Sequence, residues 1–241
     1  MAWLLCAAFL GGLSRGFSGF GAALIFVPLA SVALGPQQAA PLMLLIDVIA
    51  WVTLTPGAWA IADRREVGWL GIGALLGTPV GAAILLAFDA VTLRWGVTLV
   101  VLAMLALVAS GWRFRGRPAT PLTVGVGAVS GVLGGVAMIS GPPLIAYLLG
   151  REATARQVRA SFTLYLALAG LIAAVAYAAS GLLTMALLGP WLLAAPAYLL
   201  GTWGGSRMFG LASERAFRIA CYAMIAAAAI ISMPVWDGVL R

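Results

Sequence analysis

Residues 11–21 read GGLSRGFSGFG, and residues 130–143 read SGVLGGVAMISGPP. Each stretch interrupts a long apolar run with glycine, serine or proline, which stop a helix and leave backbone groups that lipid cannot satisfy. The first run covers residues 3–34. As one helix it would measure about 48 Å, against a hydrocarbon core of about 30 Å. We therefore expect two half-helices at each stretch, meeting inside the protein.

The composition of the whole chain is that of a membrane protein. Of 241 residues, 63% are hydrophobic and 9% are charged, and the mean hydropathy is +1.10. Soluble domains carry about 25% charged residues, so a soluble globular protein is excluded. A disordered chain is excluded because it would lack apolar residues. The net charge of +7 comes from arginines that stand between apolar runs, as in cytoplasmic loops, which argues against nucleic-acid binding.

Polar breaks divide the chain into eight apolar segments. Their expected bounds are 3–34, 38–55, 67–87, 93–112, 122–149, 158–179, 185–207 and 216–233. The first and fifth are the long, interrupted ones, and the other six have the length of a membrane-spanning helix. The segments predict an all-α polytopic membrane protein with eight helical segments and six full crossings.

The two halves of the chain resemble each other. Matching positions 115 residues apart include Gly12 and Gly127, Gly16 and Gly131, and Pro28 and Pro143. Matching positions 124 residues apart include Gly77 and Gly201, and Gly81 and Gly205. Internal repeats of this kind are typical of transporters. We expect a single transmembrane transporter domain over residues 1–241, composed of repeat 1 (1–116) and repeat 2 (117–241).

The arginines favour an inverted relation between the repeats. If all eight segments crossed, six arginines would lie on one side and seven on the other. If the first and fifth segments enter and leave on the same face, eleven share one side against Arg94 and Arg241, and the arginine-rich side is expected to be cytoplasmic. We therefore predict two inverted repeats of four segments, the first of each a re-entrant broken helix, with both termini periplasmic.

Two such hairpins, entering from opposite faces, would bring both breaks to the membrane midplane. Each returning half-helix begins there with unpaired N–H groups and about half a positive charge. Two such ends facing one cavity form an anion site made of backbone. The alternative interpretation is that these glycines and serines only allow close helix packing. The residues predicted to bind the substrate are Ser14, Arg15, Ser18, Gly19, Gly21, Ser140, Gly141, Pro142 and Pro143.

Two charged residues lie well inside apolar segments. Arg15 lies in the first break, where burial costs ~2.5–3.5 kcal/mol on insertion scales, so it requires an anionic partner or water. Its guanidinium could fork onto a sulfonate, carboxylate or phosphate-like group, or reach the interface if the hairpin is shallow. Asp47 is a candidate for carrying a coupled proton, and it could equally pair with Arg15. The other acids are expected to be solvated at segment ends: Asp63, Glu66, Asp89, Glu152, Glu214 and Asp237.

Residue types needed for several other functions are missing from the sequence. It has no histidine and two cysteines, both inside apolar runs, so neither a metal site nor a disulfide framework is expected. There is no phosphate-binding loop and no cofactor is expected. An intramembrane enzyme would need a catalytic pair of side chains, which the sequence does not offer, so we expect that the protein is not an enzyme.

The sequence GFSGFG at residues 16–21, followed by Val27-Pro28-Leu29, and the sequence SGPPL at residues 140–144 resemble the sulfite exporter TauE/SafE family of membrane permeases. The resemblance covers nearly the whole chain, including the duplicated halves. It implies a permease that moves sulfur-containing anions such as sulfite and sulfoacetate, mostly outward across the bacterial cytoplasmic membrane. Arg15 is not part of the family pattern, so its predicted role rests on the physical argument alone.

These observations together predict a secondary transporter that exports a small, sulfur-containing anion, such as sulfite or an organosulfonate, across the bacterial cytoplasmic (inner) membrane. The expected partners are the anion and membrane lipid, without nucleic acid, and the oligomeric state is left open, a homodimer included. An anion channel is the nearest alternative. Saturable flux with exchange of counter-substrate would distinguish a transporter from a channel.

Overall fold

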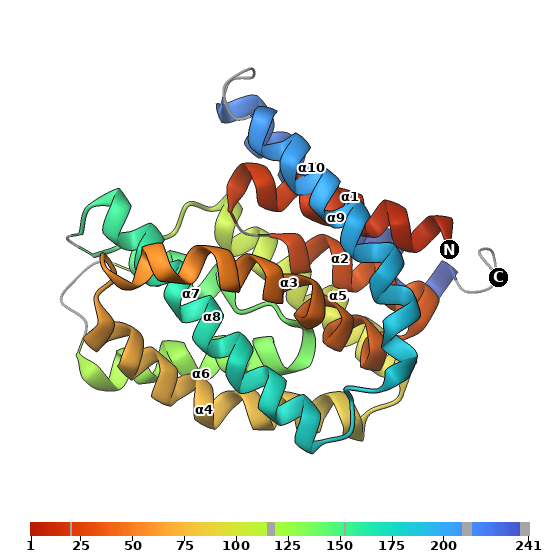
Figure 1. Cartoon of the computed structure of the whole chain (residues 1–241), viewed down its shortest axis with the longest axis horizontal. Helices are drawn as coiled ribbons and strands as arrows, with labels where there is room; N and C mark the ends of the chain where they lie inside the picture. The colour runs from red at the N-terminus through yellow and green to blue at the C-terminus, as the bar shows by residue number, and fades with distance from the viewer. Residues whose placement is uncertain (20, 115–118, 152, 209–213, 237–241) are drawn as a thin grey trace. The chain divides into compact units, whose positions relative to one another are not determined.

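A computed structural model describes the chain except residues 20, 115–118, 152, 209–213 and 237–241 (Figure 1). All regular secondary structure in its described residues is helical, and none of these residues forms a β-strand. The α-helices are α1 (Ala2–Ser18), α2 (Ala22–Leu34), α3 (Pro36–Trp59), α4 (Arg64–Ala87), α5 (Ala90–Ala109), α6 (Thr120–Ala137), α7 (Gly141–Leu148), α8 (Ala155–Ala179), α9 (Leu188–Met208) and α10 (Glu214–Ile231). Two 3-10 helices are η1 (Met185–Leu187) and η2 (Pro234–Trp236). Of the residues discussed above, Glu152, Asp237 and Arg241 lie outside the described residues, as do the side chains of Ser18 and Glu214. The predicted all-α fold is confirmed.

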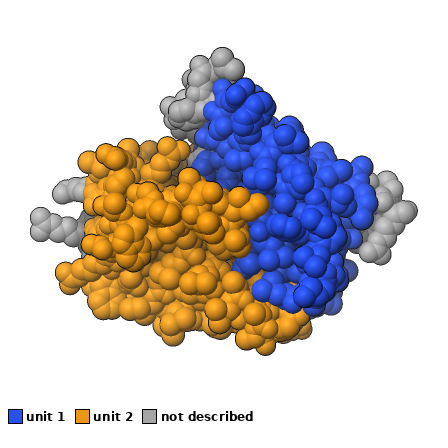
Figure 2. Space-filling model, in the orientation of Figure 1, with its two compact units in different colours: residues 1–46, 88–105, 183–241 blue, residues 47–87, 106–182 orange. Residues whose placement is uncertain are grey.

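The chain forms two compact units, shown in different colours in Figure 2. Unit 1 comprises Met1–Ile46, Phe88–Leu105 and Leu183–Arg241, and unit 2 comprises Asp47–Ala87 and Ala106–Leu182. Unit 1 therefore holds α1, α2, α9 and α10, unit 2 holds α4, α6, α7 and α8, and α3 and α5 contribute to both. Each unit takes helices from both halves of the sequence. The relation of those halves as inverted repeats stays a prediction.

Both interrupted segments are broken where the sequence predicts it. In unit 1 the break lies between α1 and α2, where Gly19 and Gly21 have φ angles of 76° and 91°. Glycine adopts this left-handed conformation without steric cost. In unit 2 the break lies between α6 and α7, where Met138 has a φ angle of 58°. A left-handed methionine is uncommon and stores strain.

Each broken segment also folds back on itself, so that its two ends lie together. Trp3, near the start of α1, donates from Nε1 to the carbonyl oxygen of Leu29 in α2 at 2.7 Å. Thr123, near the start of α6, has its hydroxyl oxygen 2.8 Å from that of Tyr147 near the end of α7. The chain therefore enters and leaves each hairpin at one end, which is the geometry that a re-entrant segment requires.

Glycines let two pairs of helices pack in backbone contact, α1 with α9 in unit 1 and α4 with α6 in unit 2. A Cβ atom added at Gly16 would collide with the carbonyl of Thr202, and one added at Gly77 would collide with the carbonyl of Ala128. Small residues are the usual means by which helices approach closely in membranes. The packing interpretation of the glycine spacing is therefore confirmed for these helices.

The glycine contacts of the two helix pairs correspond to each other, with a constant separation in residue number between matching helices. Each glycine in backbone contact between α1 and α9 has a counterpart between α6 and α4. Gly12 meets Tyr198 as Gly127 meets Leu70, and Gly16 meets Thr202 as Gly131 meets Ala74. Gly201 meets Phe9 as Gly73 meets Val124, and Gly205 meets Leu13 as Gly77 meets Ala128. Helices α1 and α6 correspond at 115 residues, as in the sequence comparison, whereas α4 and α9 correspond at 128 rather than 124. The two separations for α4 and α9 differ by four residues, about one helical turn. Small residues recur every four positions in these helices, so the sequence comparison aligned them one turn out of register.

Among the described residues, six helices are long and apolar enough to cross a membrane. They are Pro36–Trp59, Arg64–Ala87, Ala90–Ala109, Thr120–Ala137, Ala155–Ala179 and Met185–Met208. Five of them match segments that the sequence predicts to cross. The sixth, α6, is the longer arm of the second hairpin, and the described part of the last segment, Ile219–Ile231, is shorter than a span. An 18-residue helix such as α6 extends about 27 Å, so this hairpin is deep enough to reach far into a bilayer.

One expectation about the acidic residues is wrong. Glu66, at the start of α4, is 7% exposed rather than solvated. Arg151, which follows α7, forms an ion pair with Glu66 and lies 3.8 Å from Asp63. A segment end is thus no guarantee of exposure when a cation from another segment covers it. Asp89, in contrast, is exposed as expected, and the hydroxyl and N–H of Thr92 donate to its carboxylate and lower its pKa.

Gly77→Ala tests the contact between α4 and α6. The new Cβ would meet the carbonyl oxygen of Ala128, a backbone atom that cannot turn aside. We expect a loss of about 1–3 kcal/mol in stability, measured as a lower melting temperature of the purified protein in detergent. Gly68→Ala in the same helix has nothing within 4 Å of the added Cβ and is the matched control, which should keep or slightly raise the melting temperature. Equal melting temperatures for the two variants would contradict the close packing.

Candidate functional site

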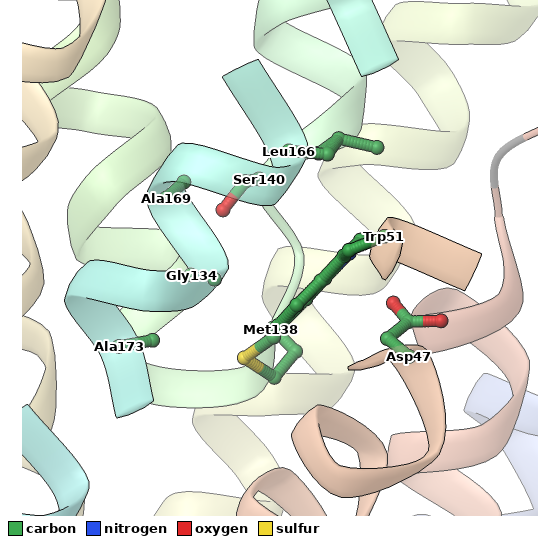
Figure 3. A pocket seen from close by; sticks show the side chains of 9 residues that line it. Asp47, Trp51, Gly134, Met138, Ser140, Leu166, Ala169 and Ala173 are labelled. Atoms are coloured by element: carbon green, nitrogen blue, oxygen red, sulfur yellow. The ribbon is translucent and has the colours of Figure 1, made fainter. Parts of the chain in front are cut away.

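A small cavity lies in unit 2 beside the second break (Figure 3). Its lining residues come from α3, from the region of the break and from α8: Asp47, Trp51, Gly134, Met138, Ser140, Leu166, Ala169, Gly170 and Ala173. The cavity and its mouth leave about 290 Å³ unfilled by atoms. The part of this space that can be compared with cavity volumes is about 20 Å³, which is room for about one water molecule, so a ligand of several atoms would require the wall to move.

Two of its polar residues, Asp47 and Ser140, were predicted from the sequence. Their side chains are buried, at 7% and 6% exposure. The Ser140 hydroxyl lies against Gly134 of α6, where a side chain would collide with it. No hydrogen bond joins this hydroxyl to another residue in the described part of the chain. Because leaving a buried hydroxyl unpaired costs about 1–3 kcal/mol, its position in the cavity wall indicates a place for a bound hydrogen-bonding group.

Trp51 adds a large ring to the cavity wall. It follows Asp47 by four residues on α3, so the two side chains share one face of the helix. The indole Nε1 of Trp51 is enclosed by protein and has no hydrogen-bond partner among the described residues. The cavity wall therefore combines a carboxylate, a hydroxyl and an indole ring in otherwise apolar surroundings.

The break itself is braced by hydrogen bonds to its backbone. The N–H of Met138 donates to the carbonyl of Gly134 at 2.8 Å, which closes the last turn of α6. Tyr177 on α8, fully buried, donates its hydroxyl to the carbonyl of Gly135 at 2.8 Å. A carbonyl that α6 leaves open at its C-terminus is thus satisfied by protein rather than water. Helix α8 both supports the break and forms one wall of the cavity.

The residues after this break begin α7 as predicted, with Gly141, Pro142 and Pro143 in its first turn. They are not among the residues that line the cavity. Proline has no N–H group, so two of the three backbone positions expected to attract an anion there have no donor. Ser140, which directly precedes them, supplies the donor that lines the cavity.

The first break, in unit 1, has a different chemical character. Gly21 is the N-cap of α2, and no proline stands in the first turn, so the N–H groups of that turn are retained. Arg15 is half-buried in the last turn of α1, and its carbonyl accepts the N–H of Gly19 at 2.8 Å. Ser14 is buried, with its hydroxyl 4.0 Å from the sulfur of Cys221. Positive charge and backbone donors are therefore concentrated at this break.

The predicted site residues thus fall into two groups. Asp47 and Ser140 line one cavity in unit 2. The residues at the first break all belong to unit 1: Ser14, Arg15, Gly19 and Gly21. Because Arg15 and Asp47 belong to different units, their pairing stays a prediction.

Sequence reasoning predicted two of the nine lining residues and missed the other seven, among them Trp51, Met138 and Gly170. The four-residue spacing between Asp47 and Trp51 was a usable signal, since it places both on one helix face. The sequence around Met138 and Gly170 gave no such signal. Met138 lies in the cavity wall at a left-handed turn of the backbone, and Gly170 matters because the ring of Trp51, on another helix, lies against it.

The comparison with protein families agrees with this architecture. The family described as Sulfite exporter TauE/SafE matches residues 4–232, a range that contains both breaks and the whole cavity. No curated protein and no solved structure matches the chain. Membrane transport is the activity of the matched family, and six candidate spans make the chain a multi-pass membrane protein. The chain belongs to the sulfite exporter TauE/SafE family.

Proposed function

We propose that this protein is a secondary transporter that exports a small sulfur-containing anion, sulfite or an organosulfonate, across the bacterial cytoplasmic membrane. The observation that carries the proposal is the cavity beside the second break. It is small, and its wall carries the hydroxyl of the buried Ser140, which has no hydrogen-bond partner in the described part of the chain. In our proposal an oxygen atom of a small oxyanion accepts a hydrogen bond from this hydroxyl.

The two folded-back segments support transport by alternating access. Transporters built from inverted repeats carry their substrates between discontinuous helices, and movement of one repeat against the other exposes the site to each side in turn. The matched glycine contacts of α1 with α9 and of α4 with α6 support a duplication of this kind. In our proposal the repeats are inverted, both termini are periplasmic, and the face with eleven arginines is cytoplasmic.

The first break is the proposed element of anion attraction. The start of α2 carries free N–H groups and about half a positive charge. The guanidinium of Arg15 belongs to the same break and has the fork of donors that matches sulfonate or sulfite oxygens. The prolines at the start of α7 make the second break a poorer source of backbone donors. We therefore propose different roles for the two breaks.

Asp47 is the proposed site of proton coupling. A carboxylate in the cavity wall would repel an anionic cargo, and a proton on Asp47 would remove that repulsion. Loading of the anion together with a proton follows from this arrangement. The membrane potential acts only on net charge: a cell interior held negative drives a monovalent anion without a proton outward by ~2.3 kcal/mol per 100 mV, whereas the same anion with a proton is neutral and is not driven by the potential.

Arg15→Ala tests the anion-binding role of the first break. We expect the KM for sulfite to rise roughly 10- to 100-fold, because a charge-assisted pair of hydrogen bonds is lost. The measurement is the initial rate of sulfite flux into proteoliposomes at varied concentration. Arg15→Lys keeps the charge without the fork and should give an intermediate KM. An unchanged KM in the alanine variant would contradict the proposed anion-binding role of Arg15.

Asp47→Asn tests proton coupling, because asparagine keeps the size of the side chain but cannot exchange a proton. We expect sulfite flux to lose its dependence on a pH gradient, while exchange of labelled against unlabelled sulfite continues. Internal pH is followed with a dye trapped in the vesicles. Asp89→Asn, at an exposed acid between α4 and α5, is the control and should behave as the wild type. Coupling that survives in Asp47→Asn would show that the proton is carried elsewhere.

A further inference from the structure

Trp51 occupies a notch in α8 that exists because residue 170 is glycine. A Cβ atom placed on Gly170 would collide with the Trp51 ring, close to three of its carbon atoms. The indole therefore fills the space that any side chain at position 170 would take. Both residues line the cavity, so this contact forms part of its wall.

The neighbouring residues of α8 are suited to the same contact. Ala169, Gly170 and Ala173 line the cavity together, and their spacing places them on one face of the helix. Their side chains are among the smallest available, which leaves the large ring of Trp51 as the bulkiest group of the wall. The size of the cavity thus depends more on Trp51 than on any other single lining residue.

The chemistry of the wall shows what the remaining space would hold. The Ser140 side chain is buried, and its hydroxyl has no hydrogen-bond partner within the described residues. The N–H of Trp51 is likewise unpaired there. The Ser140 hydroxyl can donate into the cavity, whereas the Trp51 N–H is enclosed by protein, and the space that the ring leaves is about 20 Å³. A compact oxyanion needs the least additional room beside the ring, whereas a sulfonate with a carbon chain needs room that the ring occupies.

We propose that Trp51, seated against Gly170, sets the size limit of the transported anion. In this arrangement the cavity accepts sulfite or a sulfonate with a very short chain, and longer organosulfonates are excluded by the indole. The inference rests on the proposed function and deepens it, because it names the residue that selects among sulfur-containing anions. Trp51 acts as a specificity residue through its volume, and Gly170 acts by positioning its ring.

The test compares sulfite with methanesulfonate, ethanesulfonate and propanesulfonate as substrates of the full-length protein in proteoliposomes. For Trp51→Ala we expect the kcat/KM ratio of propanesulfonate to sulfite to rise at least ~10-fold, within the range that a change of pocket size produces. Trp51→Phe should shift the ratio in the same direction by less. This variant keeps the proposal testable if Trp51→Ala does not give a monodisperse protein.

A second set of variants tests the positioning role of Gly170. Gly170→Ala should lower transport of all four substrates, because the new Cβ displaces the ring. Combining it with Trp51→Ala should restore transport, since the colliding ring is then gone. Gly125→Ala in α6 is the matched control, because nothing lies within 4 Å of its added Cβ, and it should leave transport unchanged.

The outcomes separate this inference from the function on which it rests. If the wild type transports sulfite but the Trp51 variants leave the size ratio unchanged, the inference is overturned and the proposed function stands. If the double variant does not regain transport, Gly170 does not act by positioning the Trp51 ring. If the wild type moves none of the four anions, the proposed function is overturned, and the inference with it.

Discussion

A helix that breaks inside a membrane leaves carbonyl and N–H groups that hydrocarbon cannot satisfy, and the protein itself must supply their partners. In unit 2 the hydroxyl of Tyr177 takes the carbonyl of Gly135, and Met138 accepts a strained left-handed conformation so that the chain can turn. In unit 1 two glycines make the turn without such strain. Because Tyr177 belongs to α8, the helix that braces the second break is the helix that lines the cavity. The cavity and the hydrogen bond that stabilises the break thus both depend on α8.

Backbone contact between helices provides the rest of that support. The first helix of each broken segment carries glycines that bring α1 against α9 and α6 against α4. Dispersion between closely packed backbones is a principal source of helix association where lipid is as apolar as leucine. Glycine therefore serves two purposes in this chain, turning the backbone at the first break and allowing close approach along the helices. Both uses were inferred from the sequence, since each depends only on the absence of a side chain.

The fold could be predicted further than the site. Apolar length and clusters of glycine and proline located both breaks, because these properties act locally. Asp47 and Ser140 were recognised as polar residues in apolar runs, and they line one cavity. Gly170 was not recognised, since its function arises from a ring placed by another helix. Glu66 was misjudged for a similar reason, because Arg151 from a distant segment covers it. Contacts set by the register of two helices are not visible in either helix alone.

The mixing of sequence halves within each unit has a consequence for biogenesis. Helix α1 is made well before α9, the helix that covers its glycine face, which begins about 170 residues after α1 ends. At ribosomal rates of roughly 5–20 residues per second, that interval lasts about 10–30 s. During it the nascent hairpin stands in the bilayer or the insertion machinery with its small-residue face uncovered. The contact between α1 and α9 therefore forms only after the intervening helices have been made, and a nascent chain that stops before α9 leaves the glycine face of the first hairpin uncovered.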